Sequence, residues 1–144
     1  KSEAMKRIEE QETTTGLNKI ESWIDFAEKT KQHKFQLQEM THIRGKKLLA
    51  YGASARSSTL LNFCEINHSH VSAIIDKNPL KHGLLTPGSM IPIISFEQGL
   101  REMVEDDKIF LLAWNFAEEV ISDLRSHHYN GQFIVPLPNQ PRVR

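Results

Sequence analysis

The chain has 144 residues, enough for one domain with a hydrophobic core. Its 18 Lys and Arg residues balance its 18 Asp and Glu residues, so the composition provides no basic field for nucleic acid or an anionic membrane. The single cysteine, Cys64, excludes an internal disulfide and a multi-cysteine metal site, and fits a reducing, cytoplasmic setting. No apolar run is long enough to span a membrane and no signal-peptide pattern is present. Because the chain starts at Lys1 rather than Met, we expect it to be part of a longer protein.

The first part of the chain predicts a long amphipathic helix. Residues 1–12 are strongly charged and form either a frayed helix or the end of a linker. The stretch "TTTG" separates them from a helical pattern over residues 17–40 that ends near Gly45. The apolar stripe of this helix comprises Leu17, Ile20, Trp23, Ile24, Phe26 and Ala27. We expect residues 1–43 to form a helical segment or linker that packs on a domain formed by residues 44–144.

After residue 44 the pattern alternates between strands and helices. Strands are expected at 47–53, 71–76, 91–95, 108–114 and 131–138, helices at 54–65, 96–105 and 115–128, and an extended tail at 139–144. The strands are continuous apolar runs, which are typical of parallel strands buried on both faces. The fold class expected is therefore α/β: a Rossmann-like, three-layer open parallel sheet of about five strands in the order 3-2-1-4-5. Residues 77–90 show no helical pattern, so this connection must cross over as irregular chain.

Two of the expected helices carry a signal for their N-terminus. Ser95, with Gln98 three residues later, resembles a capping box. Asn115, with Glu118 three residues later, does the same for the last helix, so we expect Asn115 to be its N-cap.

The topology itself predicts where a ligand would bind. In an open parallel sheet the site lies beyond the carboxyl ends of the strands where strand order reverses, here between the first and fourth strands. The residues that converge there are Tyr51, Gly52, Ala53, Ser54, Arg56, Asp76, Lys77, Trp114 and Asn115. Gly52 allows close approach of a ligand to the backbone, and residues 54–57 open a helix whose free N–H groups attract an anion. Arg56 adds a planar, permanently charged donor.

Other residues of this edge have a structural interpretation beside the functional one. Asp76 either binds ribose hydroxyls, as in dinucleotide folds, or caps the turn "DKNP". Lys77, Lys81 and His82 put positive charge on the second loop, and for Lys77 and Lys81 the alternative is a solvated loop charge. Trp114 offers a flat face to a base or sugar, or packs in the core. Only Gly52 matches the pattern G-x-G-x-x-G, and we expect neither a catalytic residue nor a metal site.

Four stretches together resemble one enzyme family. "LLAYGASARSSTLLNF", "IIDKNPLKHGLLTPGSMIPI", "LLAWNFAEEV" and "GQFIVPLP" are similar, in this order, to the C-terminal domain of S-adenosylmethionine-dependent sugar C-methyltransferases, over roughly residues 44–138. The resemblance implies a Rossmann-like domain that holds a nucleotide-diphosphate sugar at a cleft with a central methyltransferase domain of the same polypeptide. That central domain carries the methyl donor and the catalytic base, and a further small domain carries zinc.

The resemblance also implies which residues contact the substrate. They are Tyr51, Gly52, Ala53, Ser54, Arg56, Ser57, Thr59, Asp76, Lys77, Lys81, His82, Pro87, Gly88, Trp114 and Asn115. The family's first loop tends to read "YGAxAKG", whereas this chain has Arg56 and Ser57 in place of the Lys-Gly pair. Arginine keeps the positive charge for a phosphate, and Ser57 removes a glycine. No second strand–glycine loop–acidic strand unit is present for S-adenosylmethionine, so we expect this chain to bind no cofactor and to do no chemistry alone.

Two other functions remain open from the sequence. A nucleotide-binding module of the NAD- or CoA-binding type would use Asp76 to hold a ribose. A non-catalytic interaction domain would keep the fold without the ligand, a reading that rests on Ser57. Loss of NAD binding in Asp76→Ala would favour the first, and a cleft filled by side chains would favour the second.

Overall fold

The computed structural model describes residues 1–104 and 106–144, which form two compact units, residues 1–33 and residues 34–144. Glu105, the last residue of the helix expected at 96–105, lies outside the described residues. Within the described ranges, no helix combines the length and the apolar character needed to cross a membrane.

The N-terminal segment contains two helices, the first of which covers the residues that the sequence left open as a frayed helix or the end of a linker. α1 spans Glu3–Thr15 and α2 spans Ile20–Thr41. Gly16 separates them in the left-handed region, with φ of 74°, and its N–H donates to carbonyls of the last turn of α1. The apolar side chains of Leu17, Ile20, Trp23, Ile24 and Phe26 are all more than half exposed. Packing of this segment on the domain stays a prediction.

The second unit is built on a six-stranded sheet with the order β3-β2-β1-β4-β5-β6. Its strands are β1 (Leu48–Tyr51), β2 (Val71–Ile75), β3 (Ile93–Ile94), β4 (Lys108–Leu111), β5 (Gln132–Val135) and β6 (Arg142–Val143). The first five pair in parallel, which confirms the predicted fold class and strand order. The extended tail adds β6, which pairs antiparallel to β5.

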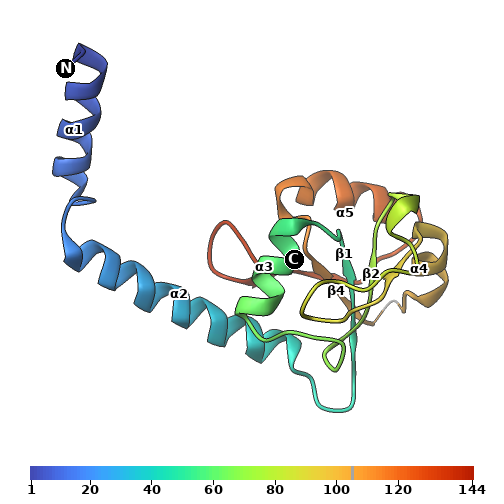
Figure 1. Ribbon diagram of the computed structural model, residues 1–144. Helices are drawn as coiled ribbons and strands as arrows, with labels where there is room; N and C mark the ends of the chain where they lie inside the picture. Colours follow the sequence, from blue (N-terminus) through green and yellow to red (C-terminus); the bar gives the residue numbers. More distant parts are fainter. Residues whose placement is uncertain (105) are drawn as a thin grey trace. The chain divides into compact units, whose positions relative to one another are not determined.

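Helices cover both faces of this sheet. The helices are α3 (Ala55–Phe63), α4 (Phe96–Glu102) and α5 (Ala117–Ser126), with short 3₁₀ turns η1 (Pro79–Lys81) and η2 (Trp114–Phe116). Because side chains alternate along a strand, Leu48 and Ala50 of β1 pack in one cluster with α3, and Leu49 and Tyr51 pack in another with α4 and α5. Figure 1 shows α3 and α4 on opposite sides of β1, as the three-layer prediction requires.

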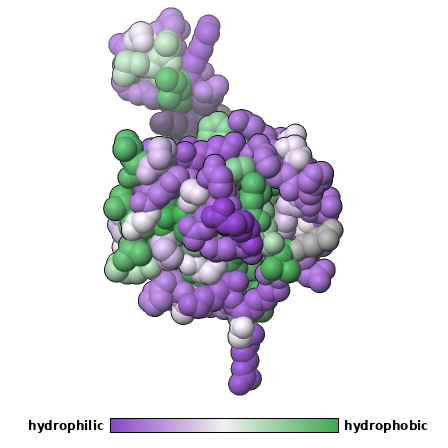
Figure 2. All heavy atoms as spheres, turned by 90° about the vertical axis from the view of Figure 1, so that its right-hand side faces the viewer, coloured by the Kyte–Doolittle hydropathy of each residue, from purple (hydrophilic) through white to green (hydrophobic). Residues whose placement is uncertain are grey.

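The connection from β2 to β3 is mostly irregular, as predicted. Beyond η1, it holds a turn in which Thr86 N–H donates to the Ile91 carbonyl at 2.9 Å. The Asn62 side chain of α3 donates to the Pro87 carbonyl at 3.0 Å, which ties the loop to the helix. Seen from the right-hand side of Figure 1, where α4 lies, the surface is mainly hydrophilic, with hydrophobic side chains in separate patches (Figure 2).

One of the two predicted helix caps is wrong. Ser95 does accept the Gln98 N–H, at 3.2 Å, and caps α4. Asn115 does not cap α5, because the chain first tightens into η2, where the Phe116 N–H donates to the Ala113 carbonyl at 2.9 Å. This turn moves the start of α5 to Ala117, and no side chain caps it.

Candidate functional site

A pocket of about 520 Å³ lies at the carboxyl edge of β1, β2 and β4, where the strand order reverses. Its volume is in the range of small-molecule sites. Among the predicted site residues, its lining includes Tyr51, Gly52, Ala53, Ser54, Arg56, Asp76, Lys77, Lys81, Trp114 and Asn115. The pocket therefore lies at the edge that the topology indicates, and binding of a ligand there stays a prediction.

Position 52 requires a glycine, because the backbone there lies close to Ala113, which follows β4. Its φ of +99° favours glycine, and a Cβ at this position would lie 2.6 Å from the Ala113 Cβ. The adjoining Tyr51 carbonyl accepts the N–H groups of Leu112 and Ala113, at 2.9 and 3.0 Å. The close approach expected at Gly52 is thus made by the protein's own backbone.

The start of α3 is held by a capping box and leaves two N–H groups free. Ser54 Oγ accepts the Ser57 N–H at 3.1 Å, and Ser57 Oγ accepts the Ser54 N–H at 2.6 Å. Ser57 is fully buried by this arrangement and is absent from the pocket lining. The N–H groups of Ala55 and Arg56 make no hydrogen bond to any described residue and carry the positive end of the helix dipole.

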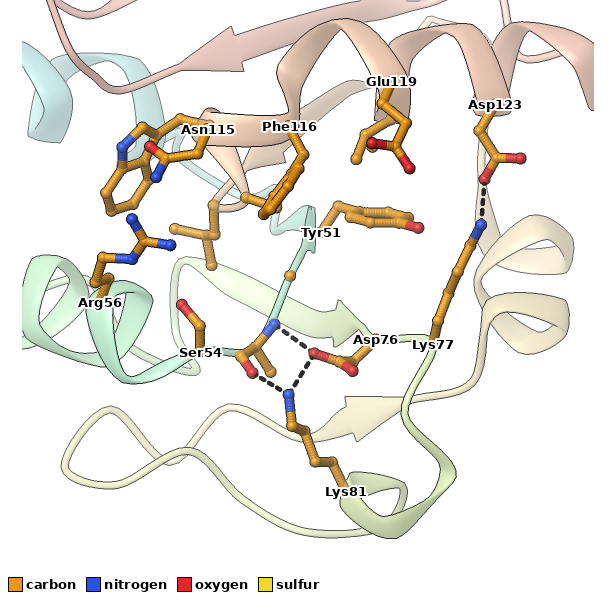
Figure 3. A pocket seen from close by; sticks show the side chains of 16 residues that line it. Tyr51, Ser54, Arg56, Asp76, Lys77, Lys81, Asn115, Phe116, Glu119 and Asp123 are labelled. Atoms are coloured by element: carbon orange, nitrogen blue, oxygen red, sulfur yellow. Dashed lines mark hydrogen bonds and ion pairs between the residues drawn. The ribbon is translucent and has the colours of Figure 1, made fainter.

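Asp76 and Lys81 join the loop after β1 to the loop after β2 through hydrogen bonds. One carboxylate oxygen of Asp76 accepts the Ala53 N–H at 2.9 Å, and the other accepts the Asn78 N–H at 2.9 Å. Lys81 Nζ lies 3.0 Å from the Asp76 carboxylate and donates to the Ala53 carbonyl at 2.6 Å (Figure 3). The turn-capping interpretation of Asp76 is confirmed, and both of its oxygens are already engaged.

The remaining charges of the pocket divide into paired and unpaired groups. Lys77 forms an ion pair with Asp123 at 2.8 Å, and this hydrogen bond raises the pKa of Lys77 above its usual value. Among the described residues, Arg56 and Glu119 have no ion-pair partner. The Arg56 guanidinium lies 6.0 Å from the centre of the Trp114 ring. In Figure 3, Arg56 and Asn115 lie at one end of the pocket, and Glu119 lies at the other.

The Tyr51 side chain lies toward the Glu119 end of the pocket. Only 6% of this residue is exposed, and its ring contacts Phe96 edge to face. Burial raises the pKa of Tyr51; Lys77 opposes this effect, and the carboxylates of Asp123, Asp76 and Glu119 add to it. Its hydroxyl makes no hydrogen bond to any part of the chain that the structure describes and is not among the buried polar atoms that lack a partner, so it opens onto the pocket.

Five predicted site residues are not brought to the pocket. They are Ser57, Thr59, His82, Pro87 and Gly88. Thr59 donates to the Ala55 carbonyl within α3 at 3.1 Å, and a ring nitrogen of His82 bonds the Asp76 carbonyl at 2.8 Å. A Cβ on Gly88 would meet the Asn62 side chain, so this glycine serves the contact between loop and α3.

The sequence analysis missed six residues of the pocket lining. They are Leu112, Ala113, Phe116, Glu119, Val120 and Asp123. The spacing of Phe116, Glu119, Val120 and Asp123 by three and four residues places them on one face of the chain through η2 and α5. That periodicity is the signal that identifies them, once α5 is known to start beside the strand reversal.

Two comparisons with known proteins bear on the family of this chain. C-methyltransferase NovU from Streptomyces niveus is 35% identical over 137 residues, which cover 92% of this chain and 32% of the relative. The chain thus spans about a third of the length of this relative. The family described as C-methyltransferase C-terminal domain matches residues 1–138. The chain belongs to the C-methyltransferase C-terminal domain family.

Proposed function

We propose that this chain is the nucleotide-sugar-binding domain of an S-adenosylmethionine-dependent sugar C-methyltransferase. One observation carries the proposal: Arg56, without an ion-pair partner among the described residues, stands beside the free N–H groups of α3 in a large pocket. The catalytic domain is expected in another part of a longer protein, because the match covers 32% of the relative.

A diphosphate fits the Arg56 end of the pocket. The free N–H groups of Ala55 and Arg56 and the helix dipole favour an anion at the start of α3. The Arg56 guanidinium provides a planar pair of donors for phosphate oxygens, and nothing in the described chain neutralises it. Ser54 and Asn115 line the same pocket and add polar groups around such an anion.

Two aromatic side chains give this anion site a flat apolar wall. Trp114 and Phe116 line the pocket from η2 and retain exposed surface, Trp114 being half-buried and Phe116 57% exposed. A nucleobase or a sugar ring can pack on such a surface while the diphosphate lies against α3. The pocket therefore combines a site for a charged diphosphate at the start of α3 with an aromatic wall for a flat or cyclic group.

The methyl donor and dinucleotides fit this pocket less well. Both carry a ribose, whose hydroxyls would be bound by the carboxylate after β2. In this structure the oxygens of that residue, Asp76, accept the N–H groups of Ala53 and Asn78 and pair with Lys81. We therefore derive no step through S-adenosylmethionine in this chain, and the engaged Asp76 also speaks against an NAD-binding module.

The direct test is a titration of the chain with nucleotide-diphosphate sugars, followed by amide chemical shifts in NMR. Arg56→Ala should weaken binding by about tenfold or more, because it removes a charge-assisted contact to phosphate. Arg44→Ala is the matched control, since Arg44 is exposed and lies outside the pocket. Unchanged affinity in Arg56→Ala, or no shifts in the wild-type chain at millimolar ligand, contradicts the proposal.

A further inference from the structure

Tyr51 carries an unused hydrogen-bonding group into the pocket. The residue is only 6% exposed, and its hydroxyl makes no hydrogen bond to any described residue. Figure 3 shows the ring lying across the pocket, with its hydroxyl directed toward the end that Glu119 and Lys77 border. The hydroxyl is not among the buried polar atoms that lack a partner, so it is open to the pocket, where a ligand can supply a hydrogen bond.

Three further groups surround the Tyr51 hydroxyl. Glu119 is exposed on α5 and has no ion-pair partner among the described residues. Lys77 and Asp123 are joined in their own ion pair at 2.8 Å. This end of the pocket, formed by Tyr51, Lys77, Glu119 and Asp123, thus offers one phenol, one ammonium and two carboxylates.

These groups select against an anionic ligand. A phosphate or carboxylate would face Glu119 and Asp123, and Lys77 is already paired with Asp123. A hydroxyl group can donate to the Glu119 carboxylate and at the same time accept from the Tyr51 phenol. A ring that carries several hydroxyls satisfies Tyr51 and Glu119 together, and it adds no charge to this end.

We propose that Tyr51 and Glu119 bind the hydroxyl groups of a neutral sugar ring, while Arg56 binds the diphosphate at the other end of the pocket. This inference rests on the proposed function, since it assigns an orientation to the same ligand. Two sugar rings of a nucleotide-diphosphate sugar have this chemistry: the hexose and the pentose of the nucleotide. The Lys77–Asp123 pair borders this end and holds its second carboxylate in place.

The test compares two ligands on four variants of the full chain, one of which is Arg56→Ala. The ligands are thymidine diphosphate and thymidine diphosphate glucose, and their affinities are measured by NMR titration. Tyr51→Phe removes only the hydroxyl, and Glu119→Gln removes only the charge. Glu118→Gln is the matched control, because Glu118 is the preceding residue of α5, has a side chain 79% exposed and lies outside the pocket.

Each of Tyr51→Phe and Glu119→Gln should weaken sugar-nucleotide binding roughly tenfold, with Glu118→Gln unchanged. If only the affinity for thymidine diphosphate glucose falls, the hexose lies at this end of the pocket. If the affinities for both ligands fall equally, the pentose lies there. Either result supports the proposal. If Tyr51→Phe and Glu119→Gln both bind the two ligands with wild-type affinity, this inference is overturned. If Arg56→Ala loses affinity in the same series, the proposed function is still supported. Absence of binding to the wild-type chain overturns both.

Discussion

Gly52 shows how one residue fixes the geometry of the pocket wall. Its φ is +99°, and an added Cβ would lie 2.6 Å from the Ala113 Cβ and 3.0 Å from the Ala113 nitrogen. Gly52→Ala should therefore lower the free energy of unfolding by at least about 2 kcal/mol, from backbone strain and overpacking together. Urea denaturation followed by circular dichroism measures this change.

Gly45 provides the matched control for this substitution. It has a similarly positive φ, +76°, but a Cβ there would meet nothing within 4 Å. Gly45→Ala should cost only about 1 kcal/mol, the strain of the left-handed conformation alone. If both substitutions lower the free energy of unfolding equally, the contact between Gly52 and Ala113 does not contribute to the cost.

The residues of the pocket were predictable to different degrees. Gly52, Ser54, Arg56 and Trp114 follow directly after strands or begin a helix, so topology alone places them at the strand reversal. The partners of Asp76 were not predictable in the same way. Its carboxylate bonds to Ala53, 23 residues earlier, and this contact depends on the register of β1 and β2.

Among the helices and strands, some positions follow from the local sequence pattern and others depend on tertiary contacts. Continuous apolar runs identified each of the five parallel strands, because burial on both faces leaves no polar alternation. The start of α5 was predicted two residues too early, since the capping pattern at Asn115 gave no sign of η2. The position of η2 depends on the contact of the preceding residue, Ala113, with Gly52, and not on side-chain preference alone.

A pair of histidines links the chain after α2 to the start of β2 and predicts a pH dependence. The rings of His42 and His70 stack with their centres 3.7 Å apart. Burial lowers the pKa of His70 below its usual 6.5, and positive charge on His42 and His68 lowers it further. Since the folded state binds this proton less well than the unfolded state, the stabilisation is complete above about pH 6.5. It is lost as the pH falls through the lowered pKa of His70.

NMR titration of the His70 ring protons measures this directly. The pKa of His70 should lie below 6.5, and His42→Gln should move it upward without restoring it fully, because burial is the larger cause. His128→Gln is the control, since His128 is exposed and lies outside the stack. A pKa of His70 at or above 6.5 in the wild-type chain would contradict the interpretation of the stack.

Truncation of the whole chain tests where the sheet domain begins. The sequence placed the boundary after residue 43, whereas the compact units divide after His33. None of residues 1–33 is buried, but Leu37 and Thr41 are fully buried, and Gln38 donates to the Cys64 carbonyl at 2.8 Å. The last part of α2 therefore belongs to the core that supports α3 and, through it, the anion end of the pocket.

A chain of residues 34–144 should keep the free energy of unfolding within about 1 kcal/mol of the full chain, because it loses no buried side chain. A chain of residues 44–144 should lose about 3 kcal/mol or more, because removal of Leu37 opens the core and leaves the Cys64 carbonyl without its partner. Urea denaturation of both chains measures the difference. Equal stability of the two would place the boundary after residue 43, and α2 would then be dispensable for the pocket. A large loss in the longer of the two would instead make residues 1–33 part of the folding unit.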